Sequence, residues 1–166
     1  MKLRKLETKD APYMLEWMHD KSVVENMHED FLNKNIEDCV NFIIKSQNDP
    51  TNIHLAIVND EDEYQGTVSL KHVESEKGEF AIAIRSSAMG KGYSHYAMNK
   101  IFEIGFRKLN LKEIYWCVDS QNLRAIKFYE KCGYSQIPKC RIHDAFIQNI
   151  SDVYLWYQVK RSDVYA

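Results

Sequence analysis

The sequence predicts an α/β fold in which a mixed, mostly antiparallel sheet of six or seven strands carries helices on both faces. Three features predict this class: mostly helical periodicity in the first third, three consecutive strand-like segments after it, and then a strand–helix–strand unit. The 166 residues are enough to bury a sizeable core in one domain. We therefore expect residues 1–166 to form a single domain.

The opening elements are a strand and then helices. Residues 2–6 alternate charged and apolar side chains, as a half-buried strand does. Thr8 is predicted to cap a helix over 10–19, and Ser22 and Asn35 are predicted to cap two more. The last of these helices has a predicted apolar face of Ile36, Val40, Ile43 and Ile44.

The middle of the chain predicts an antiparallel meander of three strands. Segments of strand composition lie at 54–58, 64–73 and 79–84. An acidic turn at 60–63 separates the first two, and a turn at 76–78 separates the last two. Short connections of this kind join antiparallel neighbours.

A crossover unit follows the meander. The apolar period becomes helical over 94–108, and strand composition returns at 113–118. With the strand at 79–84 this makes a βαβ unit, whose two strands should be parallel. Ligands favour the carboxyl ends of such strands and the start of the next helix. The candidate site therefore lies at 84–94 and 118–122.

Two elements complete the predicted fold. Asn122 is expected to cap a helix that runs to Cys132 and ends at Gly133, and residues 153–159 have strand composition.

Composition and charge exclude several classes of function. Apolar residues make up 45% of the chain and charged residues 28%, as in a globular domain. The 22 basic and 24 acidic side chains give a net charge of −2, so no chain-wide basic field favours nucleic acid or an anionic membrane. No apolar run approaches the roughly 20 residues of a membrane span, and residues 1–10 are charged rather than signal-like. We expect a cytoplasmic protein.

Cysteine and histidine spacing predicts neither a disulfide framework nor a metal site. The four cysteines contain no C-x-x-C pair, and three lie in or beside apolar-periodic segments, as buried reduced thiols do. The six histidines show neither H-x-x-x-H nor Cys/His ligand spacing, so we expect no metal. The cysteines are Cys39, Cys117, Cys132 and Cys140.

A glycine-rich loop precedes the helix at 94–108. Its glycines permit close backbone approach and its N–H groups can converge on an anion, although a plain glycine-rich start of a helix would look the same. The loop has neither Walker spacing nor the G-x-G-x-x-G of dinucleotide sites, which argues against a nucleotide-dependent switch. The candidate phosphate-binding residues are Met89, Gly90, Lys91, Gly92, Tyr93 and Ser94.

Two motifs in this order resemble those of the GNAT superfamily of N-acetyltransferases. The loop resembles the family's Q/R-x-x-G-x-G/A pyrophosphate motif, and residues 122–134 resemble its N-x-x-A-x-x-F-Y-x-x-x-G-F/Y segment. The predicted order of elements is similar over nearly the whole chain. The tail at 141–146 and 152–155 resembles the closing hairpin of the ribosomal-protein and polyamine acetyltransferase branches. Met89 and Ser94 depart from the loop motif, and Met89 removes a side-chain donor to phosphate.

The resemblance implies a single GNAT-like domain that transfers an acetyl group from acetyl-coenzyme A to a primary amine, by direct attack in a ternary complex and without a metal. It implies that the strand at 79–84 is splayed from its parallel neighbour, with the pantetheine arm in the gap. Ile82, Ala83 and Ile84 would contact that arm, and a backbone N–H there would polarise the thioester carbonyl. The acceptor would be a small-molecule or peptide amine, a homodimer is plausible, and neither nucleic acid nor a membrane is implied as a partner.

The resemblance also implies that Tyr129 is the general acid that protonates the departing thiolate. Asn122 lies seven residues earlier, two turns and roughly 10 Å along the helix, so both side chains project from the same side. Asn122 would contact the pantetheine and Tyr129 would reach the sulfur. The alternatives are a core tyrosine and an asparagine that only caps the helix.

The sequence does not identify the general base. Relatives that acetylate protein N-termini often carry a glutamate five residues before the asparagine, where this chain has Cys117. Glu79, Asp119 and Glu25 are candidate bases, and a water relay from the backbone could replace them. An acyl-accepting role for Cys117 lacks an evident base beside it.

The first third of the chain supplies aromatic and acidic residues for an acceptor pocket suited to a cationic amine. The alternative is a tryptophan in the core and solvated acids. A competing function is a non-catalytic acyl-coenzyme-A-binding sensor or partner-binding module on the same fold, which Met89 and the missing glutamate favour and Tyr129 disfavours. The candidate pocket residues are Trp17, Glu25, His28, Glu29 and Asp30.

Overall fold

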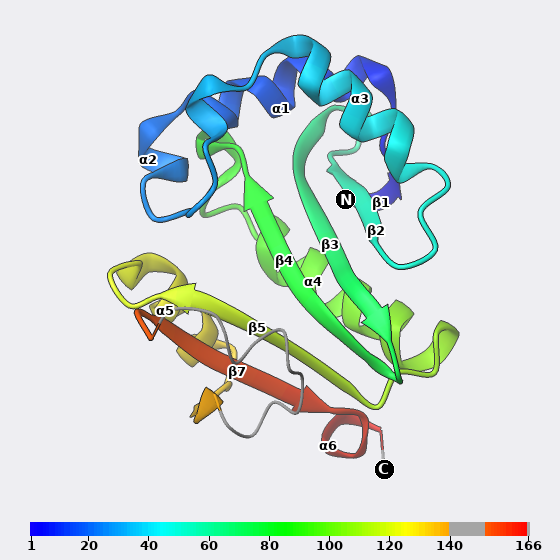
Figure 1. Ribbon diagram of the computed structural model, residues 1–166, viewed down its shortest axis with the longest axis vertical. Coiled ribbons are helices and arrows are strands. Elements are labelled where there is room, and N and C mark those ends of the chain that lie inside the picture. The colour runs from blue at the N-terminus through cyan, green and yellow to red at the C-terminus, as the bar shows by residue number, and fades with distance from the viewer. Residues whose placement is uncertain (140–151, 166) are drawn as a thin grey trace.

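The computed structural model describes residues 1–139 and 152–165, which contain one seven-stranded sheet (Figure 1). The strands are β1 (Lys2–Lys5), β2 (Ile53–Val58), β3 (Tyr64–Glu74), β4 (Lys77–Ile84), β5 (Glu113–Asp119), β6 (Gln136–Ile137) and β7 (Tyr154–Lys160). Their order is β1-β2-β3-β4-β5-β7-β6, antiparallel throughout except for the parallel pair β4 and β5. The predicted fold class is confirmed. The tail segment 141–146 and Cys140 lie outside the described residues.

Short and long helices connect these strands. They are η1 (Thr8–Asp10), α1 (Ala11–Met18), α2 (Lys21–Val24), η2 (Phe31–Asn33), α3 (Ile36–Ser46), η3 (Ser86–Ala88), α4 (Tyr93–Glu103), η4 (Ile104–Lys108), α5 (Leu123–Lys131) and α6 (Arg161–Val164). The helix predicted over 94–108 is therefore α4 followed by the π-helical turn η4.

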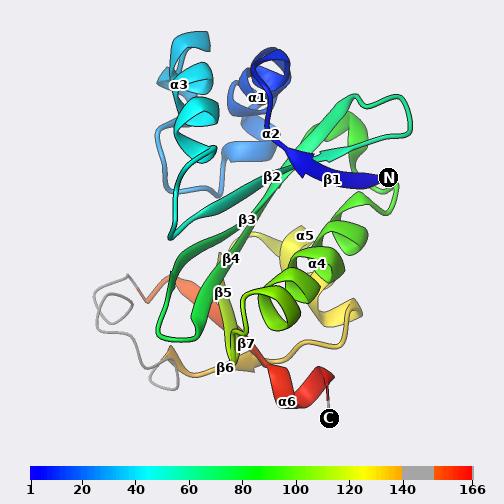
Figure 2. The ribbon, with the colours of Figure 1, turned by 90° about the vertical axis from the view of Figure 1, so that its right-hand side faces the viewer.

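Helices cover both faces of the sheet, as predicted. Side chains alternate across β2, so that Ile57 joins the core cluster of α4 and α5, whereas Ala56 and Val58 join the cluster of α1, α2 and α3. Figure 2 shows α1 and α3 on the opposite side of the sheet from α4. Each face of the sheet thus has its own apolar core.

The parallel pair β4 and β5 is splayed, which confirms that expectation. The two strands pair only where Lys77, Gly78 and Glu79 lie opposite Glu113, Ile114 and Tyr115. Beyond this point β4 continues beside β3, and β5 continues beside β7 to Asp119. Figure 1 shows the two strands close together at one end and far apart at the other.

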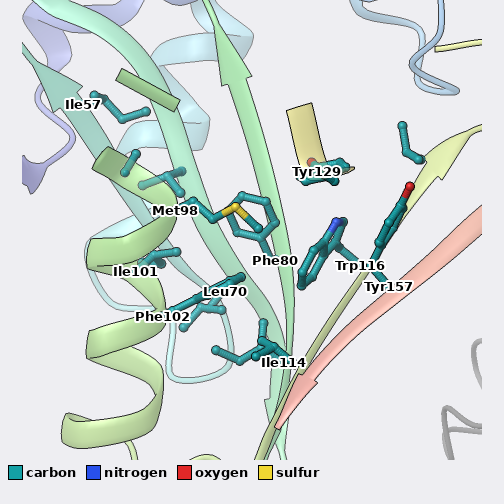
Figure 3. Packing of buried hydrophobic residues seen from close by; sticks show 14 of the residues in the cluster. Ile57, Leu70, Phe80, Met98, Ile101, Phe102, Ile114, Trp116, Tyr129 and Tyr157 are labelled. Carbon is teal, nitrogen blue, oxygen red and sulfur yellow. The ribbon is translucent and has the colours of Figure 1, made fainter. Parts of the chain in front are cut away.

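Aromatic rings occupy the diverging region on the α4 side. The Trp116 ring lies 5.6 Å from that of Phe80 on β4, 5.4 Å from that of Tyr129 on α5 and 5.6 Å from that of Tyr157 on β7 (Figure 3). All four side chains are buried. These four rings therefore fill the α4 side of the region in which β4 and β5 diverge.

Of the three helix caps predicted before residue 40, two are wrong and one is confirmed. Thr8 lies inside η1, whose N-cap position is Glu7. Ser22 lies inside α2 and donates its backbone N–H to Asp20, because the aspartate carboxylate is the stronger acceptor. Asn35 accepts the N–H of residue 38 and caps α3 as predicted.

The hairpin between β3 and β4 turns one residue earlier than predicted. Ser75 and Glu76 have φ values of 51° and 65°, so both central residues adopt the left-handed conformation of a tight two-residue turn. Consequently Lys77 already belongs to β4, and the prediction of a turn at 76–78 is corrected.

The apolar face predicted for α3 is also only partly right. Cys39 and Ile43 are buried against α1, but Ile36 and Ile44 are 45% and 57% exposed. The helix therefore presents a narrower stripe to the core than its apolar composition indicates.

Gly66 on β3 has no room for a side chain beside β4. A Cβ at this position would lie 2.4 Å from the carbonyl oxygen of Ala83 and 2.8 Å from Ile84 Cδ1. We predict that Gly66→Ala lowers the free energy of unfolding by about 1–3 kcal/mol, because backbone on β4 must move. Urea unfolding followed by circular dichroism measures this change.

Gly78→Ala is the matched control within the same hairpin. Its Cβ would meet Leu111 Cδ1 at 3.1 Å, and that atom is the end of a flexible side chain. Gly78→Ala should therefore cost less than Gly66→Ala. Equal unfolding midpoints for the parent and Gly66→Ala would contradict the predicted clash.

Candidate active site

The glycine loop forms an open cradle of backbone N–H groups at the start of α4. Gly90 and Gly92 have φ values of 76° and 88°, a conformation that only glycine adopts without strain. Gly92 is the N-cap of α4, and its carbonyl accepts the N–H of Tyr96. No side chain caps the helix.

The first-turn N–H groups of α4 are therefore available to a ligand. Those of Tyr93, Ser94 and His95 precede the first intrahelical bond, and they point along the positive end of the helix dipole. A Cβ at Gly90 would meet no atom within 4 Å, so the loop surface is open there. The exposed Lys91 adds a positive charge. This chemistry fits the pyrophosphate of coenzyme A.

Met89 has an apolar role in this loop. Its side chain packs against both core clusters, and its N–H donates to the Ser86 carbonyl at 3.2 Å. It thus anchors the loop where the two cores meet. This position explains why the chain carries methionine where the motif has a phosphate donor.

The free edge of β4 lies next to this cradle. Ile82, Ala83 and Ile84 pair with β3 on one side, opposite Val68, Thr67 and Gly66. On the other side they lie beyond the last residue that pairs with β5. Backbone groups of an extended strand that face such a gap can accept another extended chain, so this edge fits a pantetheine arm.

Tyr129 lies where α5 packs against the splay. Its side chain is 6% exposed and its phenol oxygen makes no hydrogen bond to any residue in 1–139 or 152–165. Burial raises the pKa of this phenol, so Tyr129 is protonated at neutral pH. Asn122 caps α5 by accepting the N–H of Ala125 at 3.2 Å, as predicted. The capping engages the amide oxygen and leaves its NH₂ for a ligand.

The candidate bases have different environments. Glu79 contacts His72 Nδ1 at 2.8 Å, and Asp119 contacts His28 Nε2 at 2.5 Å. The hydrogen bond from His28, and then the Gln121 N–H, hold the pKa of Asp119 below its usual range. Glu25 is exposed.

Cys117 is unsuited to covalent catalysis. Burial and then the nearby Glu79 raise its pKa to about 12, so the thiol remains protonated at neutral pH. This disfavours the acyl-cysteine alternative.

The predicted acceptor pocket is only partly assembled. Trp17 is 4% exposed in the core and donates its Nε1–H to the Tyr64 hydroxyl at 2.9 Å, so the core alternative is right for this residue. Glu25, Glu29 and Asp30 are exposed in the segment after α2. Of the predicted set, His28 is the residue that contacts the end of β5.

Tyr154 belongs to this region and was missed by sequence reasoning. Its ring lies 5.0 Å from that of His28, and it faces Asp119 in the β5–β7 register. The alternation of β7 could have placed it on this face. No sequence pattern links it with position 28.

Two further properties of the described chain bear on function. Nowhere in residues 1–139 and 152–165 do three or more His, Cys, Asp or Glu side chains gather as a group that could hold a metal ion. In the same ranges, no helix has the length and apolar character needed to cross a bilayer.

Known proteins share this sequence pattern and fold. Residues 1–135 match the acetyltransferase (GNAT) domain family. The chain is 30% identical over 153 residues to the spermidine N(1)-acetyltransferase of Escherichia coli strain K12, covering 89% of this chain and 78% of that one. It is 27% identical over 164 residues to an N-acetyltransferase of Bacillus licheniformis, covering 96% and 92%.

Solved structures agree with these sequence matches. The spermidine N-acetyltransferase of Vibrio cholerae, crystallised with coenzyme A and spermine, superposes with a TM-score of 0.80 at 21% identity, covering 97% of this chain and 95% of that one. The chain therefore belongs to the GNAT acetyltransferase family. It is an acetyl-coenzyme-A-dependent N-acetyltransferase that acts on an amine.

The cradle can be tested at Gly92. We predict that Gly92→Asp weakens acetyl-coenzyme A binding at least about 100-fold, because it places bulk and negative charge against the phosphates and strains a left-handed position. Isothermal titration calorimetry on the folded variant measures the loss.

Gly133→Asp is the control for backbone strain. Gly133 has a φ of 89° and lies at the other end of α5 from Asn122, away from the cradle. This variant should bind acetyl-coenzyme A as the parent does. Parental affinity in Gly92→Asp would refute the cradle.

Proposed function

We propose that the enzyme acetylates a primary amine of a small polycation by direct attack in a ternary complex, with Tyr129 as the general acid. The observation that carries this proposal is the protonated, unbonded phenol of Tyr129, whose ring packs against Trp116 of β5 where β4 and β5 diverge (Figure 3). If the pantetheine arm of acetyl-coenzyme A lay along the unpaired edge of β4, the sulfur of its thioester would face the phenol of Tyr129. Ile82 to Ile84 would supply the backbone contacts, one N–H of which would polarise the carbonyl.

The environment of Tyr129 supports a role in protonating the leaving group. Burial disfavours any anion in this region, so a departing thiolate would also be destabilised there. A phenol that is protonated at neutral pH can supply the proton as the C–S bond breaks. The high pKa of Cys117 supports direct transfer, since it leaves no thiolate nearby to take the acetyl group first.

Acidic side chains support a cationic acceptor. Glu79 and Asp119 lie on the face of the sheet opposite α4, at the closed and open ends of the splay. Tyr115 faces Glu79 and lies four residues before Asp119, which separates the two carboxylates by about 13 Å along β5. This spacing suits a chain with more than one ammonium group. The spermidine acetyltransferases among the relatives favour a polyamine.

Tyr129→Phe tests the acid. We predict that kcat falls by roughly 10² to 10⁴ while the affinity for acetyl-coenzyme A stays similar, because the variant loses only the hydroxyl group that donates the proton. Release of coenzyme A with spermidine measures kcat, and calorimetry measures affinity.

Tyr134→Phe is the matched control. Tyr134 packs against the same Trp116, with ring centroids 5.2 Å apart, and its phenol is half-buried. Removal of the Tyr134 hydroxyl should leave kcat near the parental value. A parental rate in Tyr129→Phe would exclude Tyr129 as the acid.

An amine panel tests the acceptor class and the competing sensor function. Spermidine, spermine, an amino sugar and a short peptide with a free N-terminus would be compared at equal concentration. We predict the highest kcat/KM for the polyamines. Stoichiometric binding of acetyl-coenzyme A without acetylation of any of these amines would favour the sensor instead.

A further inference from the structure

His28 joins the helical layer to the open end of the splay. It follows α2 in the chain, yet its Nε2 lies 2.5 Å from Oδ2 of Asp119, 91 residues away at the end of β5. The ring of Tyr154 on β7 packs against it at 5.0 Å in an edge arrangement. The imidazole is therefore fixed from two strands and still 51% exposed.

The segment before His28 also contacts the turn that follows β4, the other strand of the splay. Asp20, the N-cap of α2, lies beside Ser22 and Ser86, and hydrogen bonds from these two side chains lower its pKa. Ser86 lies in η3, two residues after the end of β4. The region from Asp20 to His28 thus contacts the end of β5 and the turn that follows β4, and Figure 1 shows α2 at the open end of the splay. An acceptor that attacks a thioester in the splay from this face would pass His28.

The contact with Asp119 determines which ring nitrogen of His28 can accept a proton. Asp119 has a lowered pKa and is a carboxylate at neutral pH, so it accepts the Nε2–H of His28. The lone pair of the neutral ring then lies on Nδ1. In the described part of the chain, Nδ1 has no hydrogen-bond partner.

The acetyl-transfer reaction requires such a group. An alkylammonium must lose a proton before its nitrogen can attack, and neutral imidazole is the side chain best matched to that task near pH 7. Cys117 occupies the position where the resemblance places a glutamate, and its thiol is protonated. Asp119 lies two residues further along the same face of β5, so His28 stands close to that position.

We propose that His28 is the general base that deprotonates the acceptor ammonium, and that Asp119 is its positioning residue. This assignment rests on the proposed function. His28 Nδ1 takes one proton from R–NH₃⁺, and the amine nitrogen then forms the C–N bond as the C–S bond breaks. Tyr129 gives its proton to the thiolate and regains one from the nitrogen of the new amide. His28 releases its proton to solvent, so the net products are the amide, coenzyme A and one proton.

His28→Gln separates the chemistry of His28 from its structural role. Glutamine can still donate an N–H to Asp119, but it cannot take a proton at neutral pH. The titratable groups that face His28 are Asp119 on β5 and Tyr154 on β7, with Glu25 and Glu29 in its own segment. Asp119 and Tyr154 remain in the variant, so their ionisation is common to both proteins.

The experiment is the pH profile of kcat/KM with spermidine, or with whichever amine of the panel the parent acetylates fastest. The profile of the parent should have an acidic limb, in which activity falls as the pH is lowered, because a protonated base cannot accept the ammonium proton. His28→Gln should lose roughly 10²-fold or more at pH 7 and lack this limb, while its melting temperature and its affinity for acetyl-coenzyme A stay parental. Asp119→Asn should lower kcat by less than His28→Gln does, and it should shift the pH at which the activity falls on the acidic side of the profile. His19→Gln, an exposed histidine whose Nε2 contacts the Lys34 carbonyl, should behave as the parent does.

Three results would overturn the assignment. A parental rate and profile in His28→Gln would exclude His28 as the base. A uniform loss at every pH with the acidic limb retained would show a structural role only. A parent that acetylates none of the amines would contradict the proposed function and this assignment with it, whereas the first two results contradict the assignment alone.

Discussion

The early end of pairing between β4 and β5 is the constraint on which the site depends. Pairing stops at Glu79 and Tyr115, and the rings around Trp116 cover the diverging strands on the α4 side. This leaves backbone hydrogen-bonding groups of β4 without a strand partner, beside a helix whose first turn is also unsatisfied. One extended ligand with an anionic end satisfies both sets of groups, which is the chemistry of an acyl-coenzyme A.

In the proposed mechanism the two faces of the splay have different chemical functions. On the α4 side, burial keeps Tyr129 protonated, and its ring packs against Trp116 of β5. On the opposite side, acidic groups and His28 surround the open end, where the helical segment after α2 meets β5 and β7. A proton donor on one face and a proton acceptor on the other match the needs of acyl transfer to an ammonium, because the leaving sulfur gains a proton and the nucleophile loses one.

The sequence predicted most of the fold because its signals are local. Strand composition, the caps Asn35 and Asn122, and the glycine-rich loop before α4 are signals that act over a few residues. The structure has the predicted feature at each of these places. Ser22 failed as a cap because a carboxylate two residues earlier competes for its N–H. The strand β6 and the helix α6 are too short to show a period. The His28–Asp119 contact joins residues 91 apart, and no local pattern carries that information.

Amide hydrogen exchange tests the central claim, that the splay holds the pantetheine arm as an added strand. Exchange would be compared for the free protein, the acetyl-coenzyme A complex and the complex with adenosine 3′,5′-bisphosphate, which lacks the arm. We expect acetyl-coenzyme A to protect amides at 81–84 as well as those at 90–95, whereas the nucleotide protects only 90–95 or nothing. Unchanged exchange at 81–84 in a saturated acetyl-coenzyme A complex would contradict this account.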